Sequence, residues 1–179
     1  MRRALFLDRD GVLNVDISPY VPDLASFEVF PYTLEALKMF HEAGFEFYVV
    51  SNQQGVSLGI TPAGELEKMS QRLQEIVRPH GFEFRRFYYA TDLDEADHPW
   101  RKPKPGMILQ AVEDFGISLE GALLIGDKWS DIVAAEAAGI PGYLVYSGVS
   151  SSRADWEGRC HPAGEFSNLL EAAHALAIA

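Results

Sequence analysis

Two aspartates separated by one residue follow a short apolar segment near the start of the chain. Asp8 and Asp10 come directly after Ala4–Leu7, whose side chains are typical of a buried strand. Two carboxylates this close repel each other unless a cation or a proton lies between them. The pair therefore indicates a metal site, acid–base chemistry or both. By itself the signal is weak, because such triplets occur by chance in acidic proteins, so later segments must support it.

Two further polar clusters follow apolar segments in the same way. Ser51–Gly55 (SNQQG) comes after the second such segment, and Gly126–Lys128 (GDK) comes after a later one, with Asp131 just beyond it. The segment Arg101–Lys104 holds three of the 15 basic residues of the chain. Because the net charge of −11 repels phosphorylated molecules at long range, a phosphate site must be made locally positive, and this segment can supply that charge.

These residue types form a set that can bind a phosphate ester and cleave it. Carboxylates from separate segments suit a hard divalent cation such as Mg²⁺, which prefers oxygen ligands. A metal ion, a lysine, a hydroxyl group and turn amides together bind phosphate. One carboxylate beside a bound phosphate can attack phosphorus, and a second can protonate the leaving oxygen and later activate water. The pattern therefore predicts phosphate-ester chemistry at a magnesium site.

Strand-like apolar segments alternate along the chain with helix-like segments. Thr61 and Ser130 are predicted to be helix N-caps, because hydroxyl oxygens accept hydrogen bonds from free N–H groups at helix starts. The predicted strands are Ala4–Leu7, Phe45–Val50, Phe84–Ala90, Ala122–Ile125 and Gly142–Tyr146. The predicted helices are Tyr32–Ala43, a segment from Pro62 toward Arg78 that ends near Gly81, Pro105 to Gly116, Ser130 to Ala138, and Phe166–Ala177.

This alternation predicts an α/β fold, a doubly wound parallel sheet with helices on both faces. Ligands of such sheets bind at the carboxyl ends of the strands. Functional residues are therefore expected just after the first, second and fourth strands, which is where the three polar clusters stand. With 179 residues, the chain fits a single domain over residues 1–179, and no segment remains for a second domain above the site.

Composition excludes several other classes of protein. The single cysteine, Cys160, rules out an internal disulfide framework and a multi-cysteine zinc site. No apolar segment approaches the roughly 18 residues of a membrane span, and the apolar run after Arg3 is too short for a signal peptide. The acidic net charge argues against nucleic acid as a partner. We expect a cytoplasmic protein, monomeric by default, that acts on a small molecule and binds no membrane.

The motifs occur in the same order as in a known family, over nearly the whole chain. They are Asp8–Gly11 (DRDG), Ser51-Asn52, Lys102, and Gly126–Lys128 followed by Asp131. In this the chain resembles the haloacid dehalogenase superfamily of aspartyl phosphatases, which implies a Rossmann-like core, here without a cap domain. The longer strings LDRDGVLN, SNQQG and RKPKPGM are more specific and resemble the subfamily of histidinol-phosphate and sugar-bisphosphate phosphatases.

The resemblance implies a role for each matching residue. Asp8 would be the nucleophile that becomes phosphorylated, and Asp10 the general acid and base. Mg²⁺ would be held by Asp8, the Asp10 carbonyl and Asp127, with Asp131 supporting these ligands. The phosphoryl group would be held by Ser51 and Lys102, and the rest of the substrate would be contacted by Asp16, Ser18, Asn52, Gln53, Gln54, Arg101 and Lys128.

One segment departs from the subfamily pattern. Many members carry a cysteine and histidine zinc loop just before the RKP string, whereas residues 90–100 here contain no cysteine and one histidine, His98. A closed zinc site needs about four good ligands, so we expect no structural zinc. The acidic run Asp92–Asp97 within this segment is most simply a solvated loop. Its alternative role is an acidic wall that receives an amine.

Three functions stay open on the sequence alone. The first is a Mg²⁺-dependent phosphatase acting on a phosphorylated sugar through an aspartyl phosphate, with heptose 1,7-bisphosphate at its 7-phosphate as the substrate that the resemblance favours. The second is hydrolysis of histidinol phosphate, which would suit the acidic loop. The third is a non-catalytic phosphate-binding protein of the same fold. The presence of both early aspartates and the metal ligands argues against this third function.

Overall fold

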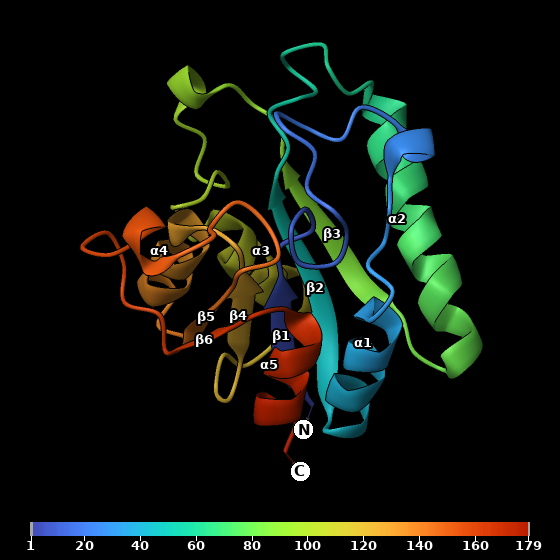
Figure 1. Cartoon of the computed structure of the whole chain (residues 1–179), viewed down its shortest axis with the longest axis vertical. Helices are drawn as coiled ribbons and strands as arrows, with labels where there is room; N and C mark the ends of the chain where they lie inside the picture. Colours follow the sequence, from blue (N-terminus) through green and yellow to red (C-terminus); the bar gives the residue numbers. More distant parts are fainter. Residues whose placement is uncertain (1, 179) are drawn as a thin grey trace.

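A six-stranded parallel sheet forms the centre of the computed structural model, which describes residues 2–178 (Figure 1). Along the sheet the strands follow the order β3-β2-β1-β4-β5-β6, and every neighbouring pair is parallel. The bounds are β1 Arg3–Leu7, β2 Phe45–Asn52, β3 Phe84–Ala90, β4 Leu123–Gly126, β5 Gly142–Val145 and β6 Gly164–Phe166. The chain therefore winds outward from β1 in one direction and then in the other, which is the predicted doubly wound topology.

Five helices cover the two faces of this sheet (Figure 1). They are α1 Thr33–Glu42, α2 Ala63–Val77, α3 Gly106–Phe115, α4 Trp129–Ala137 and α5 Leu169–Leu176. Apolar residues of α1, α2 and α5 join one core cluster, and those of α3 and α4 join a second. Short 3₁₀ helices lie at Leu24–Ser26, Arg78–His80, Asp94–Ala96 and Arg153–Asp155. The layers are thus helix, sheet, helix.

Strand β1 shows how a short apolar sequence anchors both layers. Its side chains alternate, so that Leu5 and Leu7 belong to the cluster under α1, α2 and α5, while Ala4 and Phe6 belong to the cluster under α3 and α4. All four are almost completely buried. A strand that is buried on both faces leaves little freedom at its carboxyl end, and the two aspartates follow directly from it.

Two predicted helix caps and one predicted helix start are wrong. The Thr61 hydroxyl donates to the Val21 carbonyl at 2.8 Å, and α2 begins after Pro62 without a side-chain cap. Helix α4 begins after Lys128, and Asp131 rather than Ser130 accepts the free backbone N–H groups there. Residue Phe166 ends the short strand β6, and α5 starts three residues later behind an Asn168 cap.

The carboxyl ends of β2, β1 and β4 lie side by side because these strands are neighbours in the sheet. Among residues 2–178 all strands belong to this sheet, and no cap domain stands over this edge (Figure 1). The predicted fold class is therefore confirmed. None of the helices in the same residues has both the length and the apolar character that crossing a bilayer requires.

Candidate active site

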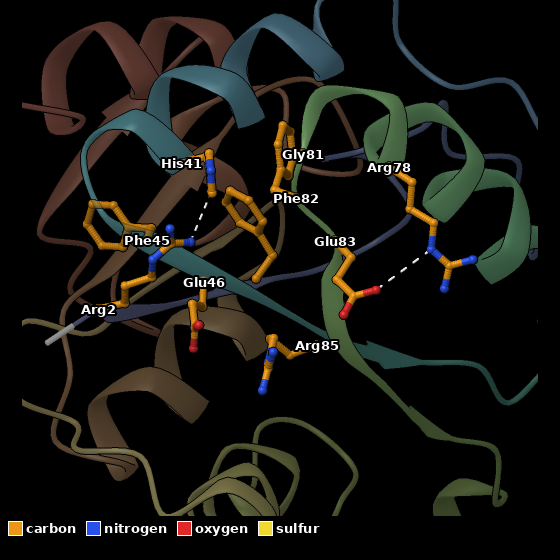
Figure 2. Close-up of a pocket in the computed structure, with 10 residues that line it drawn as sticks. Arg2, His41, Phe45, Glu46, Arg78, Gly81, Phe82, Glu83 and Arg85 are labelled. Carbon is orange, nitrogen blue, oxygen red and sulfur yellow. Dashed lines mark hydrogen bonds and ion pairs between the residues drawn. The ribbon is translucent and has the colours of Figure 1, made fainter.

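Two hollows lie at opposite ends of the sheet, and their side chains differ in kind. The larger, with an empty volume of about 770 Å³, lies beside the starts of β2 and β3 (Figure 2). Its charged groups are dispersed, and some of them pair with each other: Arg2 Nη1 lies 3.3 Å from His41 Nδ1, and Arg78 Nε lies 3.7 Å from a Glu83 oxygen. It lacks a convergent set of carboxylates and cations, so size does not identify the reactive site.

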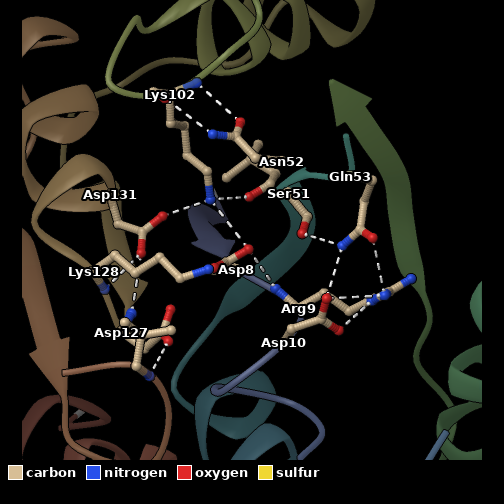
Figure 3. Close-up of polar contacts among 12 residues, drawn as sticks. Asp8, Arg9, Asp10, Ser51, Asn52, Gln53, Lys102, Asp127, Lys128 and Asp131 are labelled. Carbon is tan, nitrogen blue, oxygen red and sulfur yellow. Dashed lines mark hydrogen bonds and ion pairs between the residues drawn. The ribbon is translucent and has the colours of Figure 1, made fainter. Parts of the chain in front are cut away.

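The smaller hollow, of about 340 Å³, lies at the carboxyl edge of the sheet and does hold such a set (Figure 3). Carboxylates, lysines and hydroxyl groups from four separate segments meet there. The residues that line it are Asp8, Asp10, Asp16, Pro19, Tyr20, Ser51, Asn52, Lys102, Lys128, Ser130 and Asp131. The three polar clusters that the sequence analysis placed after the first, second and fourth strands therefore lie together.

Asp8 is a buried carboxylate that the site keeps charged. One of its oxygens accepts a hydrogen bond from the Arg9 backbone N–H at 2.8 Å and lies 3.1 Å from Lys102 Nζ. Burial alone would raise the pKa of Asp8, but the ammonium groups of Lys102 and Lys128 and the Arg9 amide outweigh it and hold this pKa below its usual range. An ionised carboxylate is the form that can act as a nucleophile.

Lys102 bridges three segments through its ammonium group. Its nitrogen donates to the Val50 carbonyl at 2.7 Å and to an Asp131 oxygen at 2.5 Å, besides its contact with Asp8. Burial works against this charge, but Asp131 and Asp8 together raise the pKa of Lys102. The lysine is therefore a permanent positive charge beside Asp8, where the charge of a phosphoryl group would need one.

Asn52 fixes the backbone that carries this lysine. Its side-chain amide donates to the Lys102 carbonyl and accepts from the Lys102 N–H, both at 3.0 Å. The pair of bonds joins the end of β2 to the segment before α3, which are 50 residues apart in the chain. Asn52 was expected to contact substrate, and the structure places it in the wall of the hollow with its amide already engaged at both ends.

Asp131 serves the start of α4 as well as the lysine. Its second oxygen accepts from the backbone N–H groups of Asp127 and Lys128 at 3.1 and 3.0 Å. A side chain at Gly126 would place its Cβ 2.2 Å from the Asp131 Cβ, so only glycine leaves room for this contact. Both Asp131 oxygens are thus engaged with the protein, in agreement with a supporting position behind the expected metal ligands.

Asp127 has an oxygen that nothing in the described residues satisfies. Its Oδ2 accepts from the Val149 N–H at 2.7 Å, whereas its Oδ1 is buried without a hydrogen-bond partner. Burial raises the pKa of Asp127 well above the ordinary range, the carboxylates of Asp8 and Asp131 act in the same direction, and Lys128 opposes them. Oxygens of Asp8, Asp127 and Asp131 all lie within 4.8 Å of one another. A group of carboxylate oxygens, one of which lacks a hydrogen-bond partner among the described residues, fits a hard divalent cation such as Mg²⁺.

Asp10 is held differently from Asp8, by a residue whose role the sequence analysis missed. Its oxygens accept from Arg9 Nε at 2.9 Å, Arg9 Nη2 at 3.1 Å and Gln53 at 3.0 Å (Figure 3). One of them also accepts from the Asn14 amide at 2.9 Å. Arg9 is completely buried. The available signal was an arginine between two aspartates at the end of a buried strand, where a solvent-exposed charge would be out of place.

The remaining expected substrate residues divide into two groups. Asp16 and Lys128 line the hollow, together with Tyr20 and Ser130, neither of which the sequence analysis expected to contact substrate. Gln53 is only 1% exposed and lies behind the hollow, donating to Asp10 and to the Ser51 hydroxyl oxygen. Outside the lining residues are Ser18, Gln54 and Arg101, and the Arg101 guanidinium instead pairs with Asp94 of the acidic run.

Sequence comparison identifies relatives across most of the chain. The HAD-hydrolase-like family model matches residues 99–172. The D-glycero-beta-D-manno-heptose-1,7-bisphosphate 7-phosphatase of Pseudomonas aeruginosa is 36% identical over 147 residues, which cover 82% of this chain and 83% of that protein. The enzyme of the same name from Helicobacter pylori is 36% identical over 144 residues, covering 80% of this chain and 83% of that protein.

Solved structures agree with this relationship. A D,D-heptose 1,7-bisphosphate phosphatase from B. bronchiseptica, complexed with magnesium and phosphate, superposes with a TM-score of 0.87 at 24% identity and covers 97% of each chain. A putative HAD-like phosphatase from Mesorhizobium loti has a TM-score of 0.77 at 31% identity, covering 98% of this chain and 86% of its own. The first comparison supports the fold, and the second also supports the sequence relationship.

Proposed function

Because the chain belongs to the haloacid dehalogenase-like family of phosphatases, we propose that it hydrolyses the 7-phosphate of a heptose 1,7-bisphosphate in a magnesium-dependent reaction. Its relatives over about four fifths of the chain carry that activity in their names. The observation that carries the proposal is Asp8, a buried carboxylate with a lowered pKa that contacts Lys102 and has an oxygen within 4.8 Å of an Asp127 oxygen.

Asp8 supplies the nucleophile. One carboxylate oxygen attacks phosphorus, a new bond forms between that oxygen and phosphorus, and the bond from phosphorus to the sugar oxygen breaks. The product of this step is an aspartyl phosphate on Asp8. The second carboxylate oxygen keeps its hydrogen bond from the Arg9 N–H and its contact with Lys102, which restrict the side chain to one orientation.

Asp10 moves the protons of both half-reactions. It donates a proton to the sugar oxygen as that oxygen leaves, and the resulting carboxylate then takes a proton from the water that attacks the aspartyl phosphate. Water adds to phosphorus, the bond to Asp8 breaks, and inorganic phosphate and free Asp8 result. Asp10 lines the hollow beside Asp8, so one side chain can serve the two steps in turn.

The phosphoryl group is held by a hydroxyl group and by positive charge at the edge of the hollow. The Ser51 oxygen accepts from Gln53 at 2.9 Å, which leaves its own O–H free to donate to a phosphate oxygen. Lys102 and Lys128 supply positive charge, and Asp16 lies opposite Lys128 for contact with the sugar hydroxyls. Bound through Asp8, Asp127 and the Asp10 carbonyl, Mg²⁺ would neutralise charge on the phosphoryl oxygens.

A panel of phosphate esters tests this proposal. Phosphate release should be measured with both anomers of heptose 1,7-bisphosphate and with histidinol phosphate, in the presence of Mg²⁺ and again with excess chelator. We expect the heptose bisphosphate to give the highest kcat/KM and the chelator to abolish turnover. A preference of a hundredfold for histidinol phosphate would assign the site to that substrate, for which the exposed Asp92–Asp97 run offers negative charge.

The variant Asp8→Asn distinguishes catalysis from simple binding. It should lower kcat by about 10⁴–10⁶-fold, since removal of a nucleophile has effects of this size, and it should keep the fold. The matched control is Asp114→Asn, an exposed carboxylate on α3 that lies outside the hollow, which should leave kcat unchanged. Wild-type protein that binds vanadate but releases no phosphate would identify a non-catalytic relative. The expectation of a monomer stays a prediction that light scattering can check.

A further inference from the structure

The carboxylate of Asp10 accepts as many hydrogen bonds as it has lone pairs. Oδ1 accepts from Arg9 Nε and from the Asn14 amide, and Oδ2 accepts from Arg9 Nη2 and from the Gln53 amide. The four distances lie between 2.9 and 3.1 Å. A carboxylate has about four acceptor positions, so these donors together fix the orientation of the Asp10 side chain.

Arg9 provides the planar half of this arrangement. Its guanidinium faces Asp10 with two parallel N–H groups, a geometry that only arginine among the side chains offers. The same group lies 5.5 Å from the ring centroid of Phe27 and 5.7 Å from that of Tyr89. These two rings, from the segment after β1 and from strand β3, restrict where the guanidinium can go. Its Nη1 is buried without a hydrogen-bond partner among the described residues.

Gln53 connects this pair to the residue that holds phosphate. Its amide nitrogen donates to Asp10 Oδ2 and to Ser51 Oγ, and its amide oxygen accepts from Arg9 Nη2 at 3.2 Å. Every polar atom of the side chain is thus engaged inside the protein, behind the hollow. Unlike the arginine, Gln53 is neutral, and its two N–H groups link Asp10 directly to Ser51.

We propose that Arg9 and Gln53 are positioning residues for Asp10: the arginine fork fixes the carboxylate next to Asp8, and the Gln53 amide holds its Oδ2 and links it to Ser51. This inference rests on the proposed function, because it concerns the acid and base of that reaction. It gives Gln53 a role behind the site in place of the expected contact with substrate. Arg9, which has no contact with the hollow, acts only through Asp10.

Comparison of two leaving groups distinguishes a misplaced Asp10 from a general loss of structure. A sugar oxygen needs a proton as it leaves, whereas p-nitrophenolate leaves without one, so a misplaced Asp10 slows phosphorylation of Asp8 only with the sugar substrate. Hydrolysis of the aspartyl phosphate needs Asp10 as a base with either substrate. A variant with a misplaced Asp10 should therefore release one equivalent of p-nitrophenolate rapidly and then turn over slowly.

The first variant is Arg9→Lys, which keeps the charge and loses the fork. We expect kcat on heptose bisphosphate to fall about 10²-fold, the effect of a misplacement of about 1 Å, with KM within about threefold. The first turnover of p-nitrophenyl phosphate should stay within about threefold of wild type, followed by a slow steady state. Gln53→Met should give the same pattern with a smaller loss, and it tests the inference if the lysine variant does not fold.

The matched control is Arg3→Lys at the opposite end of β1. Arg3 is partly buried, donates to the Ala43 carbonyl at 2.8 Å and lies 4.1 Å from the Phe45 ring centroid, so the same substitution is made at the start of β1, away from the hollow. It should leave both activities unchanged. Equal losses in the first turnover of both substrates, or no loss of kcat, would overturn the inference. Wild-type protein inactive on both substrates would instead refute the proposed function.

Discussion

The ammonium nitrogen of Lys102 lies 2.5 Å from a carboxylate oxygen of Asp131, and both side chains are almost completely buried. The lysine precedes α3 and the aspartate stands in the first turn of α4, so the pair connects two segments that only the fold brings together. Because Lys102 also contacts Asp8, the charge of the nucleophile and the stability of the α4 start depend on one cation.

Removal of the Asp131 carboxylate should therefore reduce stability more than removal of an ordinary helix cap. We expect Asp131→Ala to lower the free energy of unfolding by about 2–3 kcal/mol, because the buried Lys102 ammonium loses one of its two carboxylate partners and the Asp127 and Lys128 N–H groups lose their acceptor. Urea unfolding measures the loss. The control is Asp155→Ala, an exposed aspartate that caps a 3₁₀ helix through the Ser151 and Ser152 N–H groups and should have a clearly smaller effect. Equal effects would show that the buried pair contributes little.

Because one oxygen of Asp127 has no partner among the described residues, substitution of Asp127 should change stability and activity in opposite directions. In metal-free protein, Asp127→Asn removes a buried negative charge next to Asp8 and should raise the free energy of unfolding, while it abolishes turnover. Mg²⁺ at a hundred times its dissociation constant should stabilise wild type by about 2.7 kcal/mol, and it should not stabilise the variant. Thermal unfolding with and without Mg²⁺ measures both effects. A variant that still gains stability from Mg²⁺ would place the metal elsewhere.

Substitution of Gly11 tests whether the backbone must pass close to the Asp127 carboxylate. Its φ is +84°, and a Cβ there would lie 2.6 Å from Asp127 Oδ2. Gly44 has nearly the same φ, +86°, with nothing within 4 Å of its would-be Cβ, so it isolates the backbone effect. Gly44→Ala should lower stability by about 1–2 kcal/mol and keep activity. Gly11→Ala should lower stability by more than this, and the variant should need a higher Mg²⁺ concentration for its half-maximal rate. Equal behaviour of the two variants would contradict a close approach at Gly11.

Strands and polar clusters were predictable because each depends on local sequence. The apolar runs of the five predicted strands are long enough to be recognised in the sequence. Their observed bounds differ from the predicted ones by one or two residues at some ends; β2, for example, continues to Asn52. Strand β6 spans only Gly164–Phe166, too few residues for any periodicity, and it forms because its neighbour β5 offers a free edge. The doubly wound topology then follows from the alternation of strands and helices.

The positions of Asp8, Asp10, Ser51, Lys102 and Asp127 could be predicted because all but Lys102 lie at or just after the carboxyl end of a strand. What each neighbour does could not be predicted. Arg9, Asn52 and Gln53 are polar residues beside the site, and local sequence gives no reason why their side chains turn inward to bind protein atoms. Likewise the contact from the Val149 N–H to Asp127 joins residues 22 apart, and only the closed loop after β5 brings them together.

A hydrogen bond between Tyr88 and Asp114 should make stability depend on pH in two separate ranges. The Tyr88 hydroxyl donates to Asp114 at 2.7 Å. Burial raises the pKa of Tyr88 and the bond to Asp114 raises it further, whereas the same bond lowers the pKa of Asp114. Because the pKa of Asp114 is lowered, its charged form stabilises the fold above about pH 4, and this stabilisation is lost as the pH falls. Because the pKa of Tyr88 is raised, its neutral form stabilises the fold below about pH 10, and this stabilisation is lost as the pH rises.

The variant Tyr88→Phe removes this pair and should reveal both ranges. Its deficit in the free energy of unfolding should be constant between about pH 5 and pH 9 and should shrink below and above those limits. Urea unfolding of both proteins at a series of pH values measures the deficit. Asp114→Asn should show the acid range in the same way. A deficit that is independent of pH from 3 to 11 would mean that the bond is not charge-assisted.

Arg101 and Asp94 give a prediction about substrate affinity. The Arg101 guanidinium pairs with Asp94, whose side chain is 69% exposed, and its Nη1 is buried without a partner among residues 2–178. If Arg101 binds the second phosphate of the substrate, Asp94 competes with that phosphate for the same cation. Asp94→Asn should therefore lower KM for heptose bisphosphate by up to about fivefold, the range of an exposed ion pair, and leave kcat unchanged.

The neighbouring pair in the acidic run provides the control for this prediction. Asp97 binds Lys104 as Asp94 binds Arg101, and it is also exposed, so Asp97→Asn changes the net charge equally without freeing Arg101. Its KM should stay at the wild-type value, and KM for a monophosphate should be the same in all three proteins. Equal decreases in both variants would indicate that the total negative charge of Asp92–Asp97, and no particular pair, repels the substrate. An unchanged KM in Asp94→Asn would mean that Arg101 takes no part in binding it.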